Sequence, residues 1–97
     1  MTKGRKKSMA YVIPKAKPFV IKGEKGEYLI PAMSKLGTAD LGDVLTITPS
    51  TTIAEKAVIL KAFLLRMAPD LDKEELGDFG YLQIYQAYEQ EQQQAGK

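Results

Sequence analysis

The sequence predicts a small α+β domain, mainly α-helical, in which an N-terminal β-hairpin packs on two or three helices and follows a flexible basic arm. Three observations lead to this prediction. Residues 19–30 carry apolar side chains at alternate positions of two short segments joined by a glycine-bounded turn, residues 53–67 carry an apolar helical stripe behind a capping motif, and residues 81–88 carry a second stripe rich in tyrosine. We therefore divide the chain into a flexible basic arm at 1–17, a single domain at 18–92 and a frayed tail at 93–97.

The composition excludes several classes of function. The chain has no cysteine and no histidine, which excludes disulfides, thiolate nucleophiles, histidine general bases and Cys/His metal sites. We expect no catalytic residue, no cofactor and no metal. No apolar run reaches the ~18 residues that span a bilayer, because Lys61 and Arg66 interrupt the longest candidate, residues 57–68. We therefore expect a cytoplasmic protein without a membrane partner.

Positive charge is concentrated in the arm. Residues 1–25 hold eight lysine or arginine side chains and one glutamate, whereas the rest of the chain holds six basic and eleven acidic side chains. Such a segment can bind phosphates of nucleic acid, contact another copy of the chain, or simply keep the protein in solution. The candidate partner-binding residues of this segment are Lys3, Arg5, Lys6 and Lys7.

The first predicted element of the domain is the hairpin at residues 19–30. Apolar side chains at alternate positions give both strands one apolar face, made of Phe19, Ile21, Tyr28 and Ile30. The connection GEKG supplies glycines for a tight return, and Pro31 ends the second strand because proline lacks the N–H donor. The GxxG spacing also occurs in the KH-domain loop that clamps a nucleic-acid backbone, but that loop joins two helices, so a plain turn is favoured.

Residues 31–50 are predicted to be a loop that contains one short helix. Asp40 is a plausible N-cap, and Leu41, Val44 and Leu45 would then lie on one helical face. The glycines at 37 and 42 argue against a long helix.

The clearest prediction is a helix at 53–67. Thr52 and Glu55 have the spacing of a capping box, in which each side chain bonds the backbone N–H of the other residue. The apolar stripe that follows recurs at helical spacing and consists of Ile53, Ala57, Leu60 and Leu64. Pro69 ends the helix, since a residue before proline avoids the α region. We expect the hairpin to pack on this helix.

The last predicted element is a helix at about 79–92. Tyr81, Ile84, Tyr85 and Tyr88 recur at i, i+3, i+4 and i+7. Such a stripe usually belongs to the core. Tyrosine also buries its ring while its hydroxyl stays in water, so Tyr81, Tyr85 and Tyr88 are candidate partner-binding residues at an interface. Residues 93–97 have no apolar face and are expected to fray.

From Phe19 to about Gln92, the order of features resembles the tail assembly chaperones of long-tailed, siphophage-type bacteriophages. The matching features are the hairpin FVIKGEKGEYLIP, the helix IAEKAVILKAFLLRMA, the break Pro69-Asp70-Leu71, and the pattern of Ile84, Ala87 and Tyr88 in LQIYQAYEQ. The family commonly has tryptophan at the last aromatic position, whereas this chain has Tyr88 and no tryptophan.

The resemblance implies a non-enzymatic protein that binds and solubilises the tape measure protein during tail morphogenesis. It further implies a homo-oligomer in the host cell cytoplasm that is absent from the mature virion, and a possible longer frameshifted form that contacts the tail tube protein. Two alternatives stay open. The chain can be a small phage or bacterial structural or regulatory adaptor, or a nucleic-acid-binding module that uses the basic arm.

Overall fold

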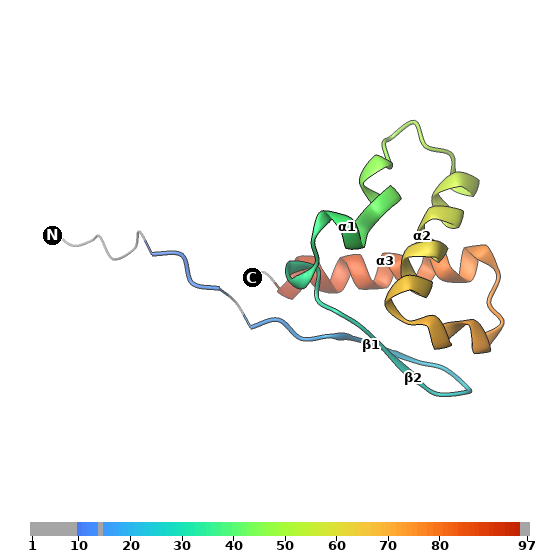
Figure 1. Ribbon diagram of the computed structural model, residues 1–97, viewed down its shortest axis with the longest axis horizontal. Coiled ribbons are helices and arrows are strands. Elements are labelled where there is room, and N and C mark those ends of the chain that lie inside the picture. Colours follow the sequence, from blue (N-terminus) through green and yellow to red (C-terminus); the bar gives the residue numbers. More distant parts are fainter. Residues whose placement is uncertain (1–9, 14, 96–97) are drawn as a thin grey trace, which may run out of the picture.

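The computed structural model describes residues 10–13 and 15–95. A two-stranded antiparallel hairpin comes first and helices follow, so the fold is α+β and mainly helical, as the sequence predicts. The elements in chain order are β1 (Phe19–Lys22), β2 (Glu27–Ile30), a 3-10 turn (Met33–Lys35), α1 (Thr38–Leu41), a 3-10 helix (Gly42–Thr46), α2 (Ile53–Met67), a 3-10 helix (Pro69–Glu74) and α3 (Asp78–Ala95). Figure 1 shows α2 across α3, with the hairpin on one side of this helix pair and α1 on the other.

The hairpin has the predicted strands and the predicted inward face. On this face the β2 side chains Tyr28 and Ile30 are buried, and the two β1 side chains are half-buried. β2 lies against α2 and β1 lies against α3, so the hairpin packs on both long helices rather than on α2 alone. On the opposite face, Val20 and Leu29 are 45% and 55% exposed. The cross-strand pairs are Phe19–Ile30, Val20–Leu29, Ile21–Tyr28 and Lys22–Glu27.

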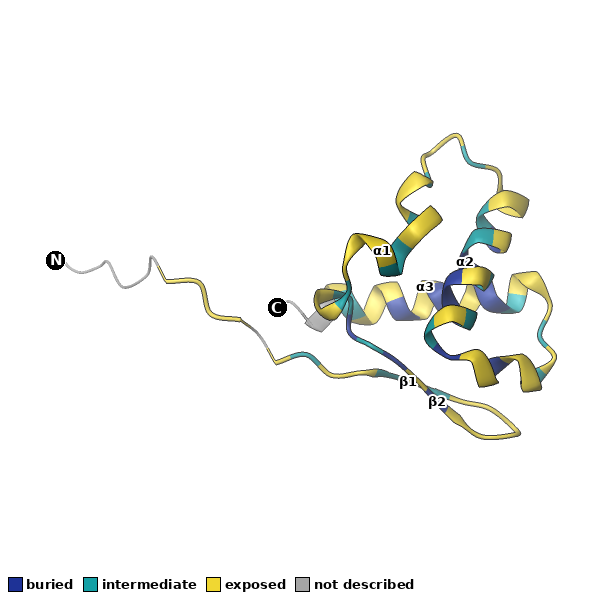
Figure 2. Ribbon diagram, in the orientation of Figure 1, coloured by how far each residue is buried: buried dark blue, intermediate teal, exposed yellow. Residues whose placement is uncertain are grey.

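Helix α2 begins and ends where the sequence predicts. The Glu55 N–H donates to the Thr52 hydroxyl at 3.1 Å, and the Thr52 N–H donates to the Glu55 carboxylate at 3.1 Å, which completes the capping box. The buried side chains of α2 are Ala57, Leu60, Phe63 and Leu64. Ile53 was expected in this stripe but is 61% exposed, because the first turn of α2 extends beyond the core (Figure 2).

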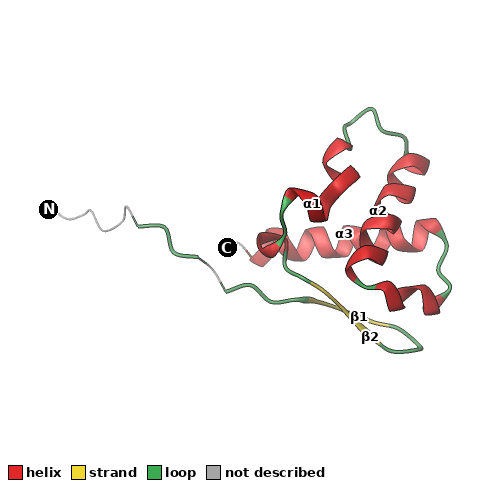
Figure 3. Cartoon of the chain, viewed as in Figure 1, coloured by secondary structure: helices red, strands yellow, loops and turns green. Residues whose placement is uncertain are grey.

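Between the hairpin and α2 the chain forms short helical turns joined by loops (Figure 3). The prediction that Asp40 is an N-cap is wrong. Gly37 is the N-cap of α1, and Asp40 lies three residues inside, where its carboxylate accepts a hydrogen bond from the Gly37 N–H at 2.8 Å. The chain turns at Gly42, which has φ +52°, a backbone conformation that favours glycine. Arg66 of α2 donates to the carbonyl oxygens of Asp40 and Leu41 and so holds α1 against α2.

Helix α3 is longer than predicted. It runs from Asp78 to Ala95, so residues 93–95 continue the helix instead of fraying. Glutamine and glutamate are good helix formers, and a helix does not need an apolar face at every turn once its earlier turns are packed. Lys61 of α2 links the two long helices, because its ammonium lies 3.4 Å from the Asp78 carboxylate and 5.6 Å from the ring centre of Tyr81.

Candidate functional site

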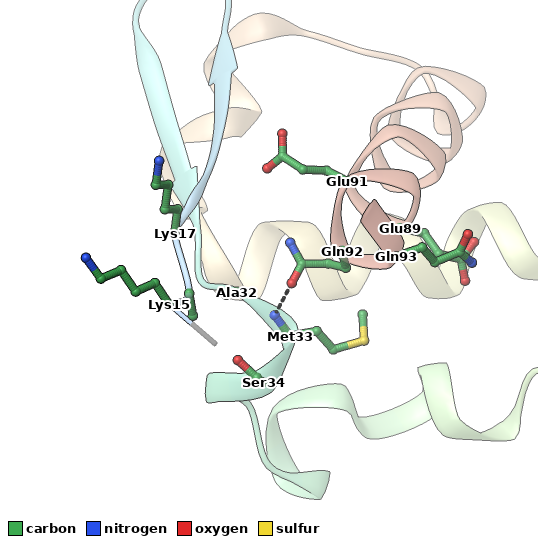
Figure 4. Close-up of a pocket in the computed structure, with 10 residues that line it drawn as sticks. Lys15, Lys17, Ala32, Met33, Ser34, Glu89, Glu91, Gln92 and Gln93 are labelled. Carbon is green, nitrogen blue, oxygen red and sulfur yellow. Dashed lines mark hydrogen bonds between the residues drawn. The ribbon is translucent and has the colours of Figure 1, made fainter. Parts of the chain in front are cut away.

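A groove opens between the residues that lead into β1, the turn that follows β2 and the last turns of α3 (Figure 4). Its volume is about 660 Å³. Two apolar residues form its floor, of which Ala32 is buried and Met33 is half-buried. The groove is therefore a surface feature with an apolar base, built from three segments that are distant in the sequence.

Two long-range hydrogen bonds hold the floor of the groove on α3. The Tyr88 hydroxyl donates to the carbonyl oxygen of Pro31 at 2.8 Å. One turn later, the side-chain Oε1 of Gln92 accepts a hydrogen bond from the Met33 N–H at 2.8 Å (Figure 4). These two bonds thus join the end of α3 to the turn after β2.

The two sides of the groove carry opposite charges. Lys15 and Lys17 belong to the chain segment before β1, whereas Glu91 projects from α3 on the hairpin side and Glu89 projects from the opposite side of the same helix (Figure 4). All four side chains are exposed. The ion pairs found among the described residues do not involve these four side chains.

A second polar cluster lies at the tip of the hairpin. The carboxylate of Glu74, which follows α2, accepts hydrogen bonds from the N–H groups of Glu24 and Lys25 at 3.0 and 2.8 Å. The Tyr28 hydroxyl also donates to this carboxylate, at 2.6 Å. Because that bond stabilises the carboxylate, the pKa of Glu74 is lowered, and the same bond raises the pKa of Tyr28 to about 12.

This cluster bears on the GxxG comparison. Successive backbone N–H groups of a turn form a concave site for anions. In this hairpin the site is filled by a carboxylate of the chain itself. A side chain at Gly23 would overlap the Glu74 carboxylate, so Glu74 would have to shift and its hydrogen bonds to the hairpin tip would be disturbed. The GEKG segment is a turn that binds an internal carboxylate, which leaves no vacant place for a nucleic-acid phosphate in this conformation.

The structure places the tyrosine stripe in the core, which corrects its interpretation as an exposed interface. Tyr81, Tyr85 and Tyr88 are 1%, 7% and 0% exposed. The rings of Tyr85 and Tyr88 pack against Phe63 and Phe19, with ring centres 5.8 Å apart for Phe63–Tyr85 and 5.5 Å for Phe19–Tyr88. Burial raises the pKa of all three hydroxyls, that of Tyr88 to about 12. A partner cannot reach these rings while the domain stays folded.

The remaining candidate partner-binding residues belong to the basic arm. Lys3, Arg5, Lys6 and Lys7 lie outside the described residues. The sequence reasoning missed Met33, Gln92 and the two glutamates of α3. Gln92 stands in the run EQEQQQ, which has no apolar pattern, and its hydrogen bond joins residues 59 positions apart. No local signal in the sequence could have identified it.

Comparison with models of known protein families, with curated protein sequences and with solved structures gives no match to this chain. Within residues 10–13 and 15–95, no helix has the length and apolar character needed to cross a membrane. The same part of the chain contains no group of three or more acidic side chains placed to hold a metal ion.

Proposed function

We propose that this chain is a non-enzymatic assembly factor that binds an apolar, helical segment of another protein in the groove at the end of α3. The resemblance to tail assembly chaperones suggests the client, which is the tape measure protein of a long-tailed phage. The observation that supports this proposal is the groove itself, with its apolar floor between a basic side and an acidic side.

The chemistry of the groove suits such a client. An amphipathic helix binds a groove through apolar side chains on one face, and its polar residues remain at the rim. The floor at Ala32 and Met33 supplies the apolar contact. The lysines before β1 and Glu91 of α3 favour a client with acidic side chains toward β1 and basic side chains toward α3, which sets its orientation.

The test is co-expression with the tape measure protein, followed by measurement of the soluble client and its co-purification. The variant Met33→Asp puts a charge on the apolar floor and should abolish capture. Glu91→Lys reverses a rim charge and should reduce capture and its salt dependence. The matched control is the double variant Gln86→Lys with Gln90→Lys, because it adds the same charge to exposed positions of α3 outside the groove.

Circular dichroism should first show that each variant is folded. Full capture of the client by folded Met33→Asp and Glu91→Lys would refute the groove as the client site. A parallel titration with duplex and single-stranded nucleic acid tests the other function. The chaperone proposal would be rejected in favour of the nucleic-acid module if the unaltered protein does not capture the client and binds nucleic acid tightly in a salt-sensitive way.

A further inference from the structure

Three large apolar side chains stand exposed before the hairpin. Tyr11, Val12 and Ile13 are 82%, 80% and 78% exposed. Figure 1 shows this segment running away from the body of the domain. The segment is long enough for a short β-strand, and its aromatic and β-branched residues favour one.

The hairpin has an open edge that can accept such a strand. β1 pairs with β2 on one side only. The Gly23 N–H points across the hairpin to the Gly26 carbonyl oxygen at 2.8 Å, and directions alternate along an antiparallel strand. The N–H and C=O groups of Val20 and Lys22 therefore point outward. An open strand edge with apolar residues pairs readily with another chain unless something covers it.

An apolar groove lies beside this edge. It has a volume of about 330 Å³ and is formed where β1 meets α3. The side chains that line it include Phe19 and Ile21 of β1 and Ile84 and Ala87 of α3. A strand added to β1 would place every second side chain over this groove.

We infer that residues 10–13 of one copy add as a third strand to the β1 edge of a second copy. Tyr11 and Ile13 then enter the groove against Ile84. Val12 faces the other way and extends the outer apolar row formed by Val20 and Leu29, which are half exposed in the single chain. One alternating segment thus covers the apolar surface on both faces of the sheet.

The short connection between residues 10–13 and β1 indicates that this segment pairs with the β1 edge of a second copy rather than with that of its own chain. Only residues 14–18, PKAKP, separate the apolar segment from β1. Prolines at both ends favour an extended conformation of the residues before them. Lys15, Ala16 and Lys17 line the groove at the end of α3, beyond the start of β1. A return to the β1 edge of the same chain would require this segment to reverse and to leave that position.

The first test is the mass of the purified full chain by sedimentation as a function of concentration. We expect a mass above that of the 10.7 kDa monomer. Tyr11→Ser combined with Ile13→Ser should weaken association about tenfold or more, as expected for buried anchor residues. The melting temperature of the monomer should not change, because these side chains are exposed in the single chain. Ala87→Lys, which fills the groove, should also weaken association, whereas the matched Gln86→Lys should not.

The second test identifies which copy supplies the strand, and it is direct because the chain has no cysteine of its own. Chains that carry Val12→Cys are mixed with chains that carry Val20→Cys under mild oxidation. A disulfide that joins one chain of each kind is expected. A chain that carries both Val12→Cys and Val20→Cys serves as the comparison. The inference would be overturned if the protein is a monomer at all concentrations, or if Tyr11→Ser with Ile13→Ser leaves association unchanged. It would also be overturned if the disulfide forms only within the chain that carries both cysteines. Glu91→Lys should leave association intact, which separates this surface from the client groove.

Discussion

Substitution of Tyr88 separates two contributions to the stability of the core. Tyr88 is fully buried, and its hydroxyl donates to the carbonyl oxygen of Pro31 at 2.8 Å. Its ring centre lies 5.5 Å from that of Phe19 and 6.2 Å from that of Phe63. The hydroxyl holds the turn after β2, and the ring fills the space between the hairpin and the two long helices.

The magnitudes follow from these contacts. Tyr88→Phe keeps the ring but leaves the Pro31 carbonyl without its donor, which should lower the free energy of unfolding by about 1–3 kcal/mol. Pro31 is half-buried, so water can replace part of the lost bond and the lower end of that range is expected. Tyr88→Ala also removes the ring and should cost about 3–5 kcal/mol, as for other buried aromatic residues. A domain of this size has only about 5–15 kcal/mol in total.

Urea unfolding followed by circular dichroism measures both values. The slope of the unfolding free energy against urea should stay the same for wild type and Tyr88→Phe, since both bury the same surface. If Tyr88→Ala is as stable as wild type but no longer captures the client, Tyr88 is not a core residue and instead contacts a partner at an interface. An equal loss in the two variants would show that the ring itself contributes nothing.

Three further predictions concern the core and the pH dependence. Leu60→Ala should lower the free energy of unfolding by about 2–5 kcal/mol, because Leu60 is buried. Ile53→Ala in the same helix should change it by less than about 0.5 kcal/mol, because Ile53 is exposed. Equal effects of the two variants in urea unfolding would contradict this packing. The pKa of Glu74 is lowered in the folded state, so its stabilisation is present at neutral pH and is lost as the pH falls below its ordinary value of 4.5. Melting temperatures should therefore fall less with acid in Glu74→Gln than in wild type, and parallel curves would disprove the role of this carboxylate. The pKa values of Tyr28 and Tyr88 are raised from 10.0 to about 12, so their contribution to folding stability should be fully present up to about pH 10 and be lost as the pH rises toward 12, which tyrosinate absorbance and ellipticity can follow together.

The sequence predicts α2 well because its signals are local. The two residues of the capping box are three positions apart, and Pro69 stops the helix within two residues of its end. The strands and register of the hairpin are equally local, since a glycine-bounded turn defines them, whereas both faces carry apolar residues and packing on the helices decides which face is buried. Such elements can be read from a few neighbouring residues without knowledge of the rest of the fold.

The candidate site could not be predicted in this way. A tyrosine stripe shows which side of α3 is apolar, but it does not show whether a partner or the hairpin covers it. The pairing of Glu74 with the hairpin tip and of Gln92 with Met33 joins residues 50 and 59 positions apart. Polar residues in loops and in glutamine runs carry no periodic signal, so only the three-dimensional structure reveals these bonds.

The bonds between the hairpin and the helices also bear on how fast the chain folds. Tyr28–Glu74, Pro31–Tyr88 and Met33–Gln92 join residues 46, 57 and 59 positions apart in a chain of 97. A two-stranded hairpin of this length is marginal by itself in water. It therefore becomes stable only when α3 closes a loop of more than half the chain. Chains with many such distant contacts fold more slowly than helical bundles of equal size. We expect α2 to form early and the hairpin to be secured last, in the same step that completes the groove.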